Sequence, residues 1–199
     1  MTGVTDPEEI ERVHFLDSLS LLGLPQVRAA RRLVDVGSGA GLPALVLALA
    51  LPEVEVTALE SVRKKCMHIE RAAALLRLEN VEVCCQRAEE YGRSAGGREA
   101  HDVAVSRALA ALPVIAEYSL PLLRIGGAMV AMKGSVSDQE CTQARDALGI
   151  LGADELATVR LYPFPGATDR RVYTAKKVRA TPGEFPRRPG IPAKRPLGQ

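Results

Sequence analysis

Residues 33–41 read Leu-Val-Asp-Val-Gly-Ser-Gly-Ala-Gly, and this stretch decides the fold. An apolar run ends in a glycine-rich turn that opens a helix, so the backbone can approach a bound ligand closely. One predicted strand later stands Glu60, where a carboxylate can accept both hydroxyl groups of a ribose. The loop and the acid together predict a nucleoside site at the carboxyl ends of parallel strands.

The glycine spacing indicates which class of ligand the loop binds. A dinucleotide fingerprint requires its third glycine three positions after the second, but Leu42 occupies that position and the glycine comes earlier, at Gly41. The pattern Asp-x-Gly-x-Gly-x-Gly instead resembles the S-adenosylmethionine loop of Rossmann-like methyltransferases. Gly37 and Gly39 are therefore expected to contact the cofactor, with Glu60 on its ribose.

Strand and helix patterns alternate along the chain, which is typical of a parallel sheet with helices on both faces. The predicted strands are 33–36, 54–59, 81–85, 103–105, 128–132, 159–164 and 172–176, and the predicted helices are 44–51, 62–78, 112–123 and 138–151. The last two strands form a hairpin. We expect an α/β, Rossmann-like class I methyltransferase fold with a mostly parallel, seven-stranded sheet.

Composition excludes several classes of protein. No apolar segment reaches the ~18 residues that a membrane helix needs, and the polar, acidic start is not that of a signal peptide. The four cysteines have no Cys-x-x-Cys spacing, so we expect reduced thiols in a cytoplasmic protein and no metal site.

Charge is unevenly distributed. Residues 160–199 hold ten basic and two acidic side chains, although the whole chain has a net charge of only +2. A basic end on an acidic body suggests a polyanionic partner. Three regions are expected: a shortened helical lobe over 1–30, the methyltransferase domain over 31–179, and a basic C-terminal arm over 180–199. The prolines of the arm predict an extended segment without regular structure.

Polar residues follow several predicted strands at one rim. They are Gln86-Arg87-Ala88-Glu89 after the third, Ser106-Arg107-Ala108 after the fourth and Lys133-Gly134 after the fifth. Such rims are where open parallel sheets bind ligands. Ala88 and Glu89 are placed to border an adenine.

Five segments in this order resemble one known family. They are His14-Phe15-Leu16-Asp17-Ser18, the loop at 34–43, Ser106-Arg107-Ala108, Met132-Lys133-Gly134 and the tail Pro186-Arg187-Arg188-Pro189-Gly190-Ile191-Pro192-Ala193-Lys194-Arg195-Pro196-Leu197. Together they resemble the bacterial small-subunit ribosomal RNA guanine-N7 methyltransferases, also called the glucose-inhibited division protein B family. The likeness covers nearly the whole chain, and its first and last segments are more specific than the glycine loop.

The resemblance implies S-adenosylmethionine as cofactor and 16S ribosomal RNA in the small ribosomal subunit as substrate, with a monomeric protein. Its cofactor contacts correspond to Gly37, Leu42, Ala88, Glu89 and Arg107. Its RNA-facing basic residues correspond to Lys64, Arg87, Lys133 and Arg170.

Two departures from the family stand out. Its members begin with a longer helical segment ending in Asn-Leu-Thr, whereas Met1 directly precedes Thr2 here. They also carry Arg-His before the last strand, where this chain has Arg170-Arg171.

The expected chemistry is simple. Guanine N7 has a lone pair and no proton, so methyl transfer to it needs no general base. It needs alignment of the two reactants, which lowers the activation barrier by on the order of 7–11 kcal/mol. Arg107 and Lys133 are the residues expected to act in catalysis, by orienting guanine through its O6. The tail cations Arg187, Arg188, Lys194 and Arg195 are expected to contact RNA phosphates. Tyr162 and Phe164 are expected in the core.

Two other functions are compatible with the sequence. One is a small-molecule methyltransferase of the same fold, although such enzymes have no need of a basic, proline-rich arm. The other is a non-catalytic module that binds RNA or S-adenosylmethionine.

Overall fold

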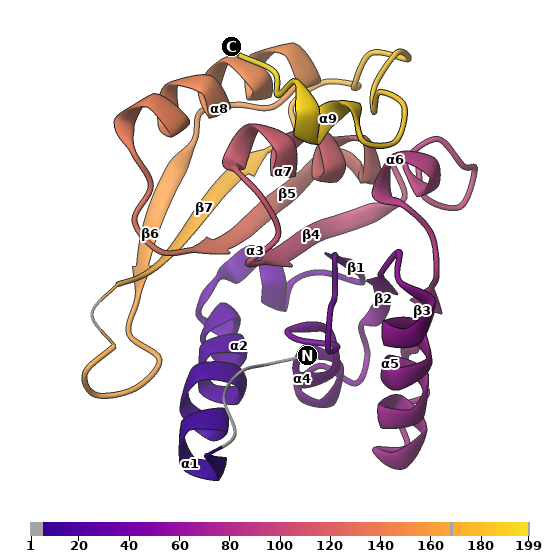
Figure 1. Cartoon of the computed structure of the whole chain (residues 1–199), viewed down its shortest axis with the longest axis vertical. Coiled ribbons are helices and arrows are strands. Elements are labelled where there is room, and N and C mark those ends of the chain that lie inside the picture. Colours follow the sequence, from indigo (N-terminus) through magenta and orange to yellow (C-terminus); the bar gives the residue numbers. More distant parts are fainter. Residues whose placement is uncertain (1–5, 168, 199) are drawn as a thin grey trace.

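The computed structural model describes residues 6–167 and 169–198, which fold around one seven-stranded sheet (Figure 1). The strands lie in the order β3-β2-β1-β4-β5-β7-β6. Strands β1 to β5 run parallel, and β7 pairs antiparallel with both β5 and β6. The strands are β1 (Arg32–Val36), β2 (Glu55–Leu59), β3 (Val81–Cys84), β4 (His101–Arg107), β5 (Leu123–Lys133), β6 (Ala157–Leu161) and β7 (Arg170–Lys176). The prediction of a mostly parallel sheet closed by a hairpin is confirmed.

Helices cover both faces of the sheet (Figure 1). The first face carries α2, α4 and α5, and the second carries α6, α7, α8 and α9. Their bounds are α1 (Pro7–Ile10), the π-helical η1 (Glu11–Leu16), α2 (Asp17–Leu19), the 3-10 turn η2 (Ser20–Gly23), α3 (Pro25–Arg28), α4 (Ala44–Ala50), α5 (Arg63–Leu75), α6 (Ala88–Tyr91), α7 (Leu112–Ser119), the 3-10 turn η3 (Leu120–Leu122), α8 (Asp138–Leu151) and α9 (Ile191–Lys194). No helix in the described part of the chain is long and apolar enough to span a bilayer.

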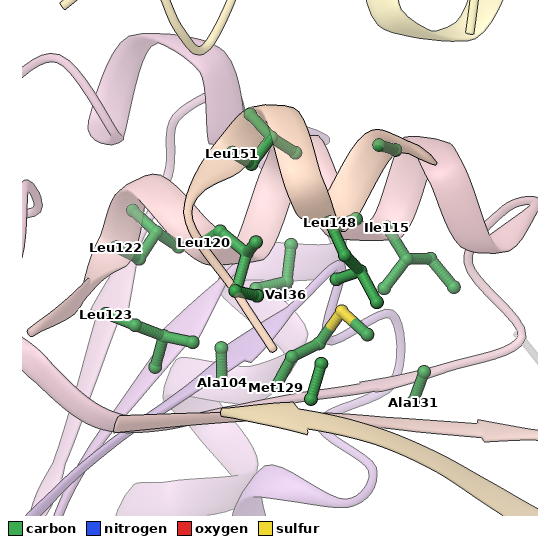
Figure 2. Close-up of a cluster of buried hydrophobic side chains, with 14 of the residues drawn as sticks. Val36, Ala104, Ile115, Leu120, Leu122, Leu123, Met129, Ala131, Leu148 and Leu151 are labelled. Carbon is green, nitrogen blue, oxygen red and sulfur yellow. The ribbon is translucent and has the colours of Figure 1, made fainter. Parts of the chain in front are cut away.

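The core is divided into two layers because successive side chains of a strand point to opposite faces. In β5, Met129 and Ala131 pack with α7 and α8, whereas Val130 and Met132 pack with the opposite layer, under α4 and α5. Figure 2 shows the first layer, in which Leu148 lies over the sheet beside Met129. The short, apolar strands of the sequence are therefore buried on both faces, as parallel strands require.

Strand β5 begins earlier than the sequence predicted. The predicted strand was 128–132, but β5 also includes Gly126 and Gly127, which lie beside a shift in register between β4 and β5. Gly126 has a φ of +89°, and a Cβ on Gly127 would lie 2.8 Å from the Asp102 carbonyl oxygen. The glycines therefore mark an irregular, close-packed strand.

The prediction of an extended arm without regular structure is wrong. The arm contains helix α9, in which Pro192 occupies the first turn, where a missing N–H does no harm. Phe185 and Thr181 are buried, and Phe185 joins the core layer of α7 and α8. The placement of Tyr162 in the core is also wrong, since its side chain is 73% exposed.

Asn80 joins three elements near the edge of the sheet. Its Nδ2 donates to the carbonyl oxygens of Ala48, Leu51 and Val54, at 3.1, 3.2 and 3.0 Å. These carbonyls belong to the end of α4 and the turn into β2, where the helix leaves acceptors without partners. The side chain therefore fixes how β2 enters the sheet.

We expect Asn80→Ala to lower the free energy of unfolding by about 1–3 kcal/mol, because it removes the donor for these buried carbonyls. Asn80→Asp should cost at least as much near neutral pH, since a carboxylate offers them no proton. Urea denaturation measures both variants. Wild-type stability in Asn80→Asp would contradict this role.

Candidate active site

A cavity of about 1180 Å³ opens at the carboxyl ends of β1, β2, β4 and β5. It lies where the strand order reverses between β1 and β4, which is where open α/β sheets bind ligands. The predicted residues Gly37, Gly39, Leu42, Glu60, Arg87, Ala88, Glu89, Arg107, Lys133 and Arg170 all line it. Residues separated by more than 130 positions are thus brought to one rim.

The glycine loop after β1 is held by backbone hydrogen bonds. Gly37, Gly39 and Gly41 have φ values of +74°, +60° and +89°, which side chains of L-residues rarely adopt. The amides of Gly37 and Ser38 donate to the carbonyl oxygen of Leu59, at 2.8 and 3.1 Å. The loop is therefore fixed to the end of β2.

Glu60 strengthens that connection. Its buried carboxylate accepts the Gly39 amide on Oε2 at 3.0 Å and the Val62 amide on Oε1 at 2.9 Å. Lys65 lies 3.7 Å from Oε2, and the Cys66 thiol donates to the Glu60 carbonyl oxygen at 3.2 Å. Both carboxylate oxygens keep lone pairs beyond these contacts, so the group can still accept hydroxyl donors.

Asp35 is fully buried at the end of β1. Its Oδ2 accepts the Ala44 amide at 3.1 Å, whereas Oδ1 has no hydrogen-bond partner among the described residues. Burial raises the pKa of Asp35 to about 7, although the hydrogen bonds from Ala44 and Ser38 act in the opposite direction. The site therefore contains a carboxyl group that titrates near neutral pH.

Two arginines connect the rim to the N-terminal helices. Arg107 Nη1 donates to the Val13 carbonyl oxygen at 3.2 Å and lies 3.4 Å from His14 Nδ1. Arg170 Nε lies 3.3 Å from Asp17 Oδ1. Burial lowers the pKa of Arg107. Burial also raises the pKa of Asp17, although the positive charges of Arg170 and Arg107 partly offset that increase. The N-terminal segment thus closes one side of the cavity through buried charge.

Lys133 is positioned by helix α8. Its Nζ donates to the Ala110 carbonyl oxygen at 2.8 Å and to Glu140 Oε1 at 2.9 Å, and the same oxygen accepts the Leu112 amide at 2.8 Å. The Ser137 hydroxyl caps α8 by accepting the Glu140 amide at 3.2 Å. The start of α8 therefore holds the lysine at the rim.

The expected RNA-binding residues occupy different environments. Lys64 is exposed on α5, and its neighbour Lys65 lines the cavity instead. Arg187, which is partly exposed, pairs with the buried Glu117, at 2.6 Å from Nη2 to Oε2. The exposed cations of the predicted set are Lys64, Arg87, Arg188, Lys194 and Arg195.

Sequence reasoning assigned no role to several residues of this site. Asp35 stands inside the quoted loop motif and could have been found there as a carboxyl group entering the core. The spacing Ser137-x-x-Glu140 is a helix-start signal that could have shown the cap of α8, but it carries no sign of the contact with Lys133. Asp17 stands in the quoted segment His14–Ser18, which pointed to the family but not to the pairing with Arg170. For Glu117 no local signal exists, because its partner Arg187 is distant in sequence.

Comparison with known proteins identifies the family. A family model described as "rRNA small subunit methyltransferase G" matches residues 1–163. The chain belongs to this family. It is 42% identical to the protein named ribosomal RNA small subunit methyltransferase G of Moorella thermoacetica over 99% of this chain and 82% of that one. It is 44% identical to the protein of the same name in Roseiflexus castenholzii, over 99% of this chain and 83% of that one.

Solved structures agree on the fold. The S-adenosylmethionine-dependent methyltransferase SibL aligns with a TM-score of 0.65 at 18% identity, over 82% of this chain and 55% of that one. An S-adenosylmethionine-dependent O-methyltransferase of Thermotoga maritima aligns with a TM-score of 0.64 at 17% identity, over 92% of this chain and 69% of that one. The predictions of this methyltransferase family, of a Rossmann-like methyltransferase fold and of S-adenosylmethionine as cofactor are confirmed.

The residues that line the cavity at the carboxyl ends of the strands fit S-adenosylmethionine. A Cβ on Gly39 would meet only the Gly37 carbonyl oxygen, at 3.8 Å, so the loop is open to a ligand on that side. Glu60 lines the cavity and offers acceptors for ribose hydroxyls, whereas Asp35 is buried and stands outside the cavity lining. Anionic groups beside an open glycine loop suit a nucleoside that carries positive charge.

We expect Asp35→Asn to change how stability depends on pH. Because the pKa of Asp35 is raised from 3.8 to about 7, the folded chain retains a proton that the unfolded chain loses. The resulting stabilisation is full below the unfolded pKa and is lost as the pH rises through about 7. When the pH is raised from about 5 to about 8, the free energy of unfolding of Asp35→Asn should rise by about 2–3 kcal/mol relative to that of the wild type.

Urea denaturation at the two pH values measures this difference in the cofactor-free protein. Taking the difference between variant and wild type removes the contributions of other titrating groups. If the difference in the free energy of unfolding between variant and wild type did not change with pH, Asp35 would be ionised in the folded chain at both pH values.

Proposed function

We propose that this chain transfers a methyl group from S-adenosylmethionine to N7 of a guanine in 16S ribosomal RNA. The observation that carries the proposal is the rim itself. In one cavity, a glycine loop and Glu60 lie on one side, and Arg107 and Lys133 lie at the ends of β4 and β5. A polyanionic substrate in the small ribosomal subunit places the protein in the cytoplasm, where we propose that it acts as a monomer.

The residues of the rim suit an acceptor that needs no deprotonation. S-adenosylmethionine supplies the methyl group as an electrophile when bound. Guanine N7 presents a lone pair, so the protein has to align the base and exclude water. Of the carboxylates that line the cavity, Glu60 and Glu89 accept backbone amides and Asp17 is paired with Arg170. None of these three is required as a base.

Arg107 and Lys133 are the residues that we assign to the target base. An ammonium group has three N–H donors, and Lys133 directs two of them to Ala110 and Glu140. A guanidinium has five donors, of which Arg107 uses Nη1 for Val13. Both side chains are held in place and can donate further, so they suit the O6 of guanine.

The surrounding cations suit the RNA backbone. Arg87 and Arg170 line the cavity mouth, and Lys64 is exposed on the neighbouring helix α5. Arg188, Lys194 and Arg195 are exposed on the arm. We assign phosphate contacts to these six residues, because such contacts need accessible positive charge and no base-specific geometry. Arg170 is included although it pairs with Asp17, since its side chain is 39% exposed. Arg187 is left out of the set, since Glu117 already binds its guanidinium.

We expect Glu60→Gln to weaken binding of S-adenosylhomocysteine, the product form of the cofactor, about tenfold to hundredfold. The amide loses the charge and turns an NH₂ group toward one of the two backbone amides that the carboxylate now accepts. Calorimetry measures the affinity. Glu55→Gln at the exposed opposite end of β2 is the matched control and should bind as the wild type does. Equal affinities in the two variants would exclude Glu60 from the site.

Transfer of labelled methyl groups tests the proposed function. The purified protein is given labelled cofactor with naked 16S ribosomal RNA, with intact small subunits, or with a metabolite extract. We expect label in the RNA at one guanine. Label only in metabolites would identify a small-molecule methyltransferase, and no label in any fraction would identify a binding module.

We expect Lys133→Met to lower kcat/KM for RNA by about tenfold to hundredfold, as loss of a base-reading donor does. Affinity for S-adenosylhomocysteine should stay within about threefold of the wild type, because the lysine is assigned to the base. Lys176→Met, exposed on β7, is the control. A parallel loss of cofactor affinity in Lys133→Met would reassign the residue to the cofactor.

A further inference from the structure

The first half of the C-terminal arm is bound to the body by arginines. The arm crosses the face of the sheet that carries α6, α7 and α8 (Figure 1). Arg93 Nε donates to the Pro186 carbonyl oxygen at 2.8 Å, and Arg98 Nη1 donates to that of Phe185 at 2.8 Å. Phe185 itself is buried in the core. This half of the arm is therefore part of the folded domain.

Two buried carboxylates hold the second half. Glu117 on α7 has a fully buried side chain, and it accepts the backbone amide of Arg187 at 2.8 Å together with Nε and Nη2 of the same residue. Glu89 on α6 is 3% exposed and accepts the Gly190 amide on Oε1 at 2.8 Å. Arg187 Nη2 also donates to the Arg195 carbonyl oxygen at 2.8 Å. Residues 187–195, here called the arm loop, are thus fixed at both ends.

The arm loop reaches the cavity. Ala193 of helix α9 lines it together with Ala88, Glu89 and Tyr118. These residues lie beyond β3, at the end of the cavity expected to receive the adenine of the cofactor. Glu89 therefore serves as an acceptor for the arm backbone rather than as an isolated acid at the rim.

We propose that the arm loop is a wall of the cofactor cavity, held there by Glu89 and Glu117 as positioning residues. The inference rests on the proposed function only for the identity of the cofactor. Ala193 of the loop lines the cavity, and the loop also carries the exposed cations Arg188, Lys194 and Arg195, which are the ones assigned to RNA. One segment thus serves both the cofactor and the RNA.

Hydrogen exchange on the native chain tests the proposal without any substitution. S-adenosylhomocysteine is added, and amide exchange is followed by mass spectrometry. We expect slower exchange in the glycine loop, residues 37–42, and also in the arm loop. Protection of the glycine loop alone would overturn the arm-loop proposal and leave the proposed function standing. Protection of neither would overturn both.

Variants of the Arg187–Glu117 pair provide a second test. Arg187→Met combined with Glu117→Gln removes both charges, so that neither is left buried without its partner. We expect affinity for S-adenosylhomocysteine to fall roughly tenfold or more, because the wall is no longer pre-organised. Arg188→Met, at the exposed neighbour, is the matched control and should leave cofactor affinity unchanged while weakening RNA binding.

Calorimetry with the cofactor product and filter binding with 16S ribosomal RNA separate the two effects, and a melting curve confirms that each variant is folded. A purely structural role would lower the melting temperature and leave both affinities of the folded protein intact. Wild-type cofactor affinity in the folded double variant would therefore overturn the proposal.

Discussion

The contact between the Glu60 carboxylate and the backbone of the glycine loop is the interaction on which the site depends. Gly37, Gly39 and Gly41 have positive φ and offer no side chains of their own to hold the loop. The carboxylate supplies that support by accepting the amides of Gly39 and Val62, one from each side of the cavity edge. Burial makes these charge-assisted bonds strong, and it also makes them necessary, because an unpaired buried carboxylate is costly.

The elements around Glu60 extend that constraint into the sheet. Asn80 fixes the entry of β2, the strand that ends at the residue before Glu60, and the Cys66 thiol donates to the Glu60 carbonyl oxygen from helix α5. Burial and the neighbouring Cys85 thiol raise the pKa of Cys66 to about 12, so this thiol remains protonated and remains a donor. The geometry of the loop therefore depends on packing well outside the motif that identifies it.

Most of the sheet and the rim could be predicted because their signals are local. Short apolar runs mark the strands, and the residues just after β1, β2, β4 and β5 come to one edge in any parallel sheet of this order. Arg107 and Lys133 were found in this way. The boundaries were less predictable. The predicted fifth strand began only at residue 128, because sequence does not show that the Asp102 carbonyl packs against Gly127 inside the strand.

The arm could not be predicted because its partners lie far away in sequence. Arg187 and Glu117 are separated by 70 positions, and Gly190 and Glu89 by 101. Proline content indicated a segment without regular structure, and the positive charge indicated a solvent-exposed one. Both arguments treat the arm as isolated, whereas the buried carboxylates Glu89 on α6 and Glu117 on α7 need positive charge or N–H donors and obtain them from this segment.

Both ends of the chain close the cavity by the same physical means. The N-terminal helices are connected to it through Asp17 with Arg170 and through Val13 with Arg107, and the arm is connected through Glu89 and Glu117. Ion pairs of this kind contribute little net stability, because desolvation offsets much of their attraction. They do penalise every arrangement in which one partner is buried alone. The arrangement therefore favours a single closed geometry around the cofactor over several loosely packed ones, and alignment of a base that needs no proton transfer depends on such a geometry.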